Sequence, residues 1–168
     1  MKHVYRTIAV AALLLIMAHP GPAAGQMTAN EEALVETQAQ RHVERYYNFY
    51  YERDPQSLST EIFSSPWMTI GGNGIHIITQ EENLAYFEAA IKGLLARDWN
   101  RSSFTTKNVC ALTEGSAIVS GTNTRSRTDG SIMSVGGVTY FLGKTDEGWR
   151  IISYSGHAAN KVVHCPVK

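Results

Sequence analysis

The chain has 168 residues, its 15 basic and 15 acidic side chains balance, and 43% of its residues are hydrophobic. No basic stripe or block of like charges appears, which argues against nucleic acid and an anionic membrane surface as partners. This length allows one domain with a sizeable core and does not allow two.

The first 25 residues have the pattern of a signal peptide. Lys2 and Arg6 give a positive start, residues 8–18 form an apolar run, and Pro, Gly and Ala follow up to Gly25. The run has 11 residues, whereas a membrane-spanning helix needs about 20. We therefore expect a signal peptide over 1–25, with an uncleaved anchor as the alternative. The mature protein is expected to be secreted or periplasmic, without stable membrane insertion.

Cleavage there would leave residues 26–168, which we interpret as a single domain. Removing 25 of 168 residues leaves 143, and the loss of Lys2 and Arg6 leaves 13 basic against 15 acidic side chains. The core of this domain is predicted over about 31–157, with a C-terminal tail over 158–168. Nothing in it repeats at a fixed period.

Two helices are predicted first in the domain. Thr28 to Glu31 fits a capping box, in which a Thr hydroxyl and a Glu carboxylate bind free amides at a helix start. The helix is predicted to run to about Glu52, with an apolar stripe at the spacing of helical turns. Asp54-Pro55 predicts a second, short helix, because Asp caps and Pro suits the first helical position.

A hairpin and a third helix are expected next. Residues 67–70 and 75–78 are apolar enough for two short strands around the turn-rich Gly71-Gly72-Asn73-Gly74. A second capping box begins at Thr79, and the helix that follows carries apolar residues on one face. That face requires a large buried partner, which only a sheet can supply.

Four consecutive strands are predicted to supply this sheet, over about 103–112, 116–127, 131–143 and 149–156, with short turns between them. Helices followed by an antiparallel meander define the α+β class. Simple alternation along the last strand places Trp149, Ile151, Ser153, Ser155 and His157 on one face and Arg150, Ile152 and Tyr154 on the other. Gly136 and Gly137 are expected to let the sheet bend.

This order of elements resembles the nuclear transport factor two-like superfamily, which includes SnoaL-like proteins and steroid isomerase relatives. The resemblance covers about residues 31–157 and depends on two stretches: an aromatic-rich first helix ending in Glu52-Arg53-Asp54, and the closing Gly148-Trp149-Arg150-Ile151-Ile152. It implies N-terminal helices packed in a curved antiparallel sheet, a cone-shaped α+β barrel with an apolar cavity. Members of the superfamily include enzymes, ligand binders and dimerisation modules, so this fold does not choose among functions.

The resemblance also suggests where chemistry would occur. Tyr46 corresponds to a pocket tyrosine of the isomerase relatives, and His157 and His76 are the imidazoles expected near the cavity as general bases. Each of the three has a plain structural alternative, Tyr46 in the core and the histidines at strand ends. The isomerase carboxylate would fall within residues 67–74, which contain no Asp or Glu. Steroid isomerase chemistry is therefore not expected.

The predicted cavity is lined mainly by aromatic side chains: Tyr46, Tyr50, Trp67, Tyr140 and Trp149. Asn123, Arg125 and Arg127 share one face of the second long strand. On the inner face they would bind an anionic or carbonyl group, but their position near a turn favours a polar outer face.

Cys110 and Cys165 are the two cysteines, and an oxidising compartment would allow a disulfide between them. Two separate thiols are the alternative, since the sequence does not give the separation of the two Cα atoms. No metal site and no cofactor are predicted.

Three functions follow as expectations. The first is an exported SnoaL-like domain that binds a small, mainly apolar molecule in the cone. The second is a metal-independent cyclase, isomerase or dehydratase that uses His and Tyr as acid and base. The third is a dimerisation or protein-interaction module. The cone domain is also expected to form a homodimer through an exposed sheet face.

Overall fold

The computed structural model describes residues 27–165, so the predicted signal peptide over 1–25 lies outside the described residues. The elements are α1 (Ala29–Glu52), α2 (Pro55–Ser57), the π-helical turn η1 (Leu58–Ile62), β1 (Phe63–Gly71), β2 (Gly74–Ile78), α3 (Gln80–Leu95), β3 (Trp99–Thr113), β4 (Ser116–Arg127), β5 (Ile132–Thr145) and β6 (Gly148–His157). No helix among the described residues is long and apolar enough to cross a bilayer.

The helix starts follow the predicted capping boxes. At α1 the Thr28 backbone N–H donates to the Glu31 carboxylate at 2.7 Å, and the Glu31 N–H donates to the Thr28 hydroxyl at 3.3 Å. At α3 the Thr79 N–H donates to Glu82 at 3.1 Å. These bonds satisfy amides that have no partner within the helix. The prediction that the first helix ends at Glu52 is confirmed, and Arg53 follows in the left-handed conformation with a φ of 59°.

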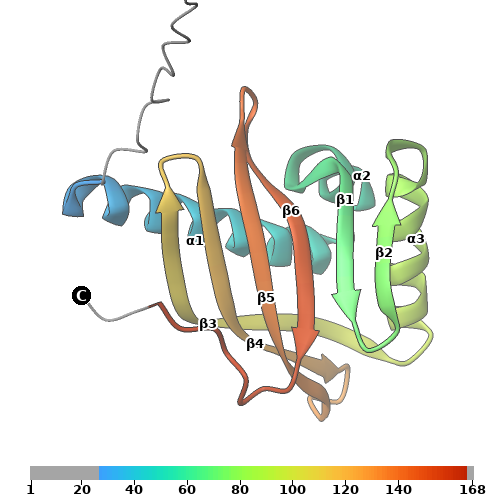
Figure 1. The fold of residues 1–168 in the computed structure, drawn as a ribbon. Coiled ribbons are helices and arrows are strands. Elements are labelled where there is room, and N and C mark those ends of the chain that lie inside the picture. The colour runs from blue at the N-terminus through green and yellow to red at the C-terminus, as the bar shows by residue number, and fades with distance from the viewer. Residues whose placement is uncertain (1–26, 166–168) are drawn as a thin grey trace, which may run out of the picture.

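One six-stranded sheet, in the order β2-β1-β6-β5-β4-β3, curves around the helices (Figure 1). The α+β class and the curved sheet are confirmed, but the sheet is mixed rather than antiparallel. The predicted hairpin of β1 and β2 joins it because β1 pairs in parallel with β6. The sequence pattern indicates only strands that pair with their neighbours in the chain through short turns, whereas the pairing of β1 with β6 joins strands from opposite ends of the domain.

The core lies between α1 and the concave inner face of the sheet. Helix α1 crosses behind β3 to β6 in Figure 1 and contacts β3, β4 and β6. Its buried residues Val35, Ala39 and Val43 pack with Val119 and Leu142 from the sheet. Helix α3 closes the side next to β1 and β2. Burial of these apolar side chains is the main driving force for this fold.

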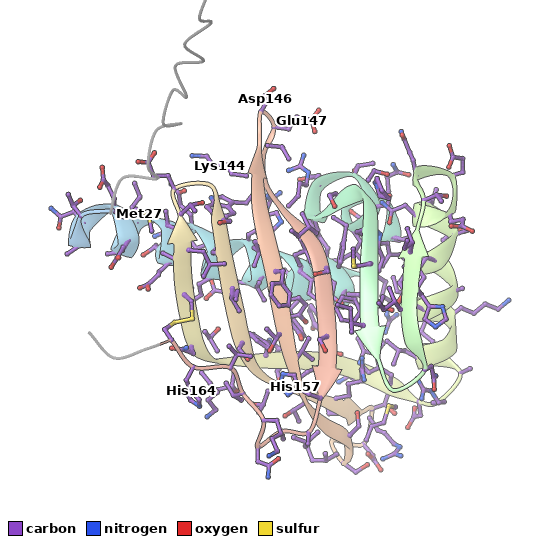
Figure 2. All side chains as sticks on the ribbon, in the orientation of Figure 1. Met27, Lys144, Asp146, Glu147, His157 and His164 are labelled. Atoms are coloured by element: carbon purple, nitrogen blue, oxygen red, sulfur yellow. A yellow bond between two sulfur atoms is a disulfide. The ribbon has the colours of Figure 1, made fainter. Side chains whose placement is uncertain are left out.

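The outer face of the sheet is partly covered by the C-terminal tail. Cys110 on β3 and Cys165 in the tail form a disulfide with a Cα–Cα separation of 5.7 Å, seen as a yellow bond in Figure 2. The Val163 N–H donates to the Ser120 hydroxyl at 3.0 Å. Of the two alternatives that the sequence left open for the cysteines, the structure has the bonded one, and the tail is thereby attached to the sheet.

Candidate functional site

The inner face of the sheet is buried at one end and opens toward the other. On β4, Ala117 and Val119 are buried, whereas Asn123 and Arg125 further along the same face are half-buried. On β5, Tyr140 is buried and Val138, nearer that end, is half-buried. The cone therefore opens where β4 and β6 finish and β1 turns into β2, at the lower end of Figure 1.

We call this open end the cone mouth. It is defined by the inner-face residues that surround it: Tyr50, Tyr86, Asn123, Arg125, Gly136, Val138, Tyr154 and Gly156.

Two glycines leave space in the mouth. A Cβ atom added to Gly156 would meet no atom within 4 Å, and one added to Gly136 would meet only the His157 carbonyl oxygen, at 3.9 Å. Gly156 pairs with Val138, and Gly136 pairs with Asn123. Because neither glycine presents a side chain, the sheet surface beside Val138 and Asn123 is open to a bound group.

Aromatic rings form the wall behind the mouth. Tyr46 lies at the centre of the cluster, edge-to-face with Tyr47, Tyr50, Phe63 and Tyr140 at centroid distances of 5.0–5.7 Å. Such geometry is favourable because the positive edge of one ring faces the negative face of the next. Tyr46 nevertheless keeps partial exposure.

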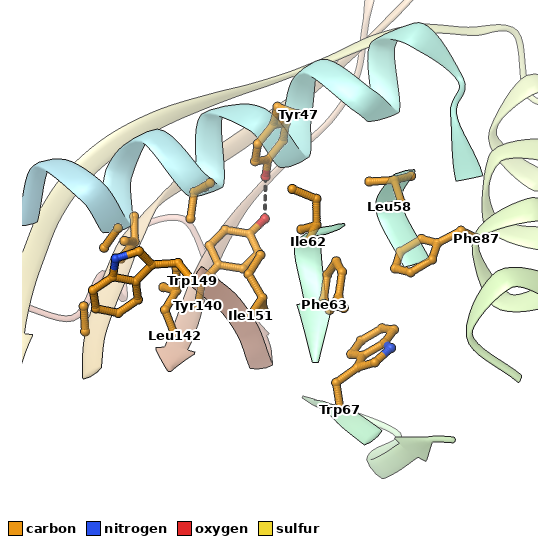
Figure 3. Packing of buried hydrophobic residues seen from close by; sticks show 14 of the residues in the cluster. Tyr47, Leu58, Ile62, Phe63, Trp67, Phe87, Tyr140, Leu142, Trp149 and Ile151 are labelled. Carbon is orange, nitrogen blue, oxygen red and sulfur yellow. Dashed lines mark hydrogen bonds between the residues drawn. The ribbon is translucent and has the colours of Figure 1, made fainter. Parts of the chain in front are cut away.

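The tyrosine hydroxyls bind one another in pairs. Tyr47 and Tyr140 share a hydrogen bond of 2.7 Å, drawn as a dashed line in Figure 3, and Tyr86 and Tyr154 share one of 3.0 Å. Burial raises the pKa of Tyr46 and of Tyr140 well above the ordinary value, and it also raises the pKa of Tyr154. These hydroxyls are neutral near pH 7, as ordinary tyrosines are, and they can donate hydrogen bonds.

Arg125 and Asn123 point into this aromatic interior, so the expectation of a polar outer face is wrong for both. Asn123 is the cross-strand partner of Phe104, whose ring stacks on Tyr47. Burial raises the pKa of Tyr50, and the positive Arg125 guanidinium opposes this shift, which places the charge near the ring. The side-chain Oδ1 of Asn123 and Nε of Arg125 are buried and have no hydrogen-bond partner within residues 27–165. Unpaired buried polar atoms are costly and rare.

The five residues predicted to line the cavity divide into two groups. Tyr46, Tyr50, Trp67 and Tyr140 belong to one connected cluster of rings. Trp149 is buried toward the closed end of the cone, where its indole N–H donates to Gln38 at 2.9 Å. The Trp67 N–H likewise donates to Asn83 at 2.8 Å. Sequence reasoning missed Tyr86, Phe104 and Tyr154, which complete the wall.

His157 lies on the outer face of the sheet, so the predicted face of the last strand is wrong beyond Ile151. The register of β5 and β6 shifts between Phe141 and Leu142: Leu142 pairs with Ile151, whereas Phe141 pairs with Ser153. The extra residue, Ile152, forms a bulge that reverses the alternation. Tyr154 therefore faces the cone, and Ser153 and His157 face away from it. Figure 2 labels His157 at the end of β6.

His76 is exposed on the edge strand β2, opposite Thr69. Of the other imidazoles, His42 is buried in α1, and its Nε2 donates to the Ile62 carbonyl oxygen at 3.0 Å. None of the buried polar residues among the described ones is Asp or Glu. No group of three or more His, Cys, Asp and Glu side chains within residues 27–165 could hold a metal ion.

Surface clefts lie outside the cone mouth. A cleft of about 190 Å³ opens between α1 and β3 and reaches the Tyr47 and Phe104 rings. A larger cleft of about 730 Å³ lies between η1, the start of α3 and the turn from β5 to β6, with Arg150 in its wall. Arg150 is already paired with Glu147 at 2.9 Å. The unpaired Arg125 therefore makes the mouth the better candidate.

A long helix held inside a curved six-stranded mixed sheet, with aromatic side chains facing an open end, is the cone architecture of NTF2-like proteins. Residues 32–159 match the family model of the NTF2-like protein family DUF6841, and the chain belongs to this family. No functionally curated protein matches the chain.

Solved structures share the fold at low identity. An NTF2-like protein with a cystatin-like fold from Novosphingobium aromaticivorans is 15% identical, with a TM-score of 0.62 over 77% of this chain and 85% of its own. An NTF2-like protein of unknown function from Shewanella oneidensis is 18% identical, with a TM-score of 0.59 over 71% and 96%. An NTF2-like superfamily protein from Salmonella enterica is 15% identical, with a TM-score of 0.56 over 81% and 94%. At such identities the likeness concerns the fold alone.

Proposed function

We propose that this NTF2-like domain binds a small, mainly apolar molecule in the cone mouth. The observation that supports this most directly is the change from buried to half-buried side chains along the inner sheet face, next to two glycines with open space above them. Binding sites for small molecules are typically concave, aromatic and supplied with a few polar groups. The mouth lies on the inner face of a curved sheet, and it has aromatic walls and a few polar groups.

Native mass spectrometry of the mature protein, combined with titration by the neutral fluorescent probe N-phenyl-1-naphthylamine, tests this proposal. A retained ligand or saturable probe binding with one site per chain is expected. G156L should weaken probe binding at least tenfold, because the new side chain occupies the mouth. G93L, which adds the same side chain to an open position on α3, is the matched control. Equal binding by wild type and G156L would contradict the proposal.

The enzyme alternative has less support. A metal-independent cyclase, isomerase or dehydratase needs a base beside the acid at the mouth. Tyrosine hydroxyls there can donate a hydrogen bond, but His157 occupies the opposite face of the sheet and binds Thr139 at 2.8 Å. His157 therefore does not supply a base beside the tyrosines of the mouth.

We also propose export and homodimer formation. The disulfide supports an oxidising compartment, and N-terminal sequencing of the exported protein should place the start of the mature chain near residue 26. For the dimer, the support is a group of apolar side chains exposed on the outer face of β1, β2 and β6: Met68, Ile75, Ile77 and Ile152.

Sedimentation equilibrium tests the dimer. I77K should shift a dimer toward monomer, because a charge would be buried at the interface. L34K, at an equally exposed apolar position on α1, should leave the mass unchanged. A monomeric wild type would contradict the dimer without affecting ligand binding.

A further inference from the structure

We infer that the molecule bound in the cone mouth is a small apolar carboxylic acid whose carboxylate is held by Arg125. The inference rests on the proposed binding function and specifies its ligand class. It depends on the position of one positive charge relative to the groups around it.

Arg125 has no acidic partner among the residues that the structure describes. The two ion pairs within residues 27–165 are Arg45–Glu61 and Arg150–Glu147, and both lie elsewhere. Arg125 is half-buried and its Nε is buried without an acceptor. A guanidinium in this position is best satisfied by an anion, because it presents parallel N–H donors that match the two oxygens of a carboxylate.

The neighbours of Arg125 cannot supply that anion. Its cross-strand partners are Ser102 on β3 and Ser134 on β5, both uncharged. The charge also acts on Tyr47, Tyr50 and Tyr154, whose hydroxyls are neutral near pH 7, and burial raises their pKa values further above the ordinary value of 10. Neutral hydroxyls can donate to a carboxylate but cannot replace it.

The remaining groups of the mouth define the rest of the ligand. The rings of Tyr50 and Tyr154 offer apolar surface for a flat hydrocarbon body. The amide of Asn123 lies one inner-face position before Arg125 on β4. Its Nδ2–H group can donate to the ligand, whereas its Oδ1, buried without a partner among the described residues, can only accept. In a ligand with a carboxylate at one end and an apolar body at the other, the carboxylate would lie at Arg125 on β4 and the apolar body would lie against the Tyr50 and Tyr154 rings.

The test compares two probes of nearly equal shape, 2-naphthoate and its neutral methyl ester, by isothermal titration calorimetry at pH 7. Wild type should bind the acid at least about tenfold more tightly than the ester, which is the effect of one charge-assisted hydrogen-bonding pair. R125Q should bind both probes about equally, and R125K should keep part of the preference because it retains the charge. R127Q removes the same charge on the same strand, where Arg127 binds the Ile132 carbonyl oxygen, and should behave as wild type.

Equal binding of acid and ester by wild type would overturn the inference that the site recognises a carboxylate. A preference for the acid that survives in R125Q would overturn the role of Arg125. If 2-naphthoate fails to bind while N-phenyl-1-naphthylamine binds, the inference of a carboxylic acid ligand is wrong, whereas the proposal of an apolar binding site remains supported. If neither binds, both proposals fall. The comparison of the two probes on wild type needs no variant, so it decides the question even if R125Q does not fold.

Discussion

The imidazole of His157 lies directly over Gly137, on the outer face of the sheet. Its Nε2 bonds to the Thr139 hydroxyl at 2.8 Å, and its Nδ1 to the Ala158 carbonyl at 2.9 Å. A Cβ atom on Gly137 would collide with the ring and with the Ala158 backbone. The absence of a side chain at Gly137 therefore leaves room for the His157 ring at the end of β6 and for the start of the tail.

This contact predicts a coupled pair of substitutions. G137A should lower the free energy of unfolding by about 1–3 kcal/mol, the usual effect of overpacking. The same change in an H157A background should have a smaller effect, because the ring is gone and only the backbone contact remains. Urea denaturation of the four proteins of this cycle measures the coupling. Additive effects would show that the ring is not packed on Gly137 in solution.

The paired hydroxyls of Tyr47 and Tyr140 predict a second cycle. Either Y47F or Y140F leaves one buried hydroxyl without its partner and should cost about 1–3 kcal/mol. The double variant removes both hydroxyls and should be less destabilised than the sum of the single variants. Phenylalanine keeps the ring contacts, so packing is a constant in this comparison. Y51F, at an exposed tyrosine on α1, is the control.

The helices were predictable from local signals, whereas the pocket face of the last strand was not. Capping boxes at Thr28 and Thr79 depend on side chains three residues apart, so the sequence contains the whole motif. The bulge at Ile152 depends on pairing with β5, a strand whose own register is set by β4. Alternation is a reliable guide only where no residue is inserted. One inserted residue moved Tyr154 into the cone and His157 out of it.

The inner position of Arg125 was also missed in the sequence analysis. A charged residue near a hairpin turn is usually solvated, and this general tendency was given more weight than the alternation along β4. Its inner position follows from Val119, which is buried in the core and lies on the same face of β4. The alternation along that strand contained this signal, and the apolar residues at its start indicated which face was inside.

The buried His42 predicts a loss of stability in mild acid. Burial lowers the pKa of His42 below its ordinary value of 6.5, although its hydrogen bond to Ile62 acts in the opposite direction. The unfolded chain therefore binds a proton at a higher pH than the folded protein does. The contribution of neutral His42 to stability is fully present above the pKa of the unfolded chain. It is lost as the pH drops through 6.5 toward the pKa of the folded protein.

H42N should flatten this slope between pH 7 and pH 5.5, measured by urea denaturation, although it lowers stability at pH 7. H76N changes an exposed imidazole on β2 and serves as the control for the loss of a histidine. A wild-type stability that does not change over this range would contradict the assignment of a buried neutral imidazole.

The disulfide predicts that reduction releases the tail while the sheet remains folded. Cys110 and Cys165 close a loop of 55 residues in sequence, and loss of such a link typically costs about 2–4 kcal/mol. The double variant C110S/C165S should lose about this amount in free energy of unfolding.

The amide of Val163, which binds the Ser120 hydroxyl, should exchange with solvent much faster in this variant, whereas the exchange of amides in the centre of β5 should change only with the global stability. Ser120 and Thr139, buried beside the tail and joined at 2.7 Å, would then gain exposure on the outer face. Hydrogen exchange of the variant followed by mass spectrometry measures both regions at once. Unchanged protection at Val163 would show that its bond to Ser120 holds the tail without the disulfide.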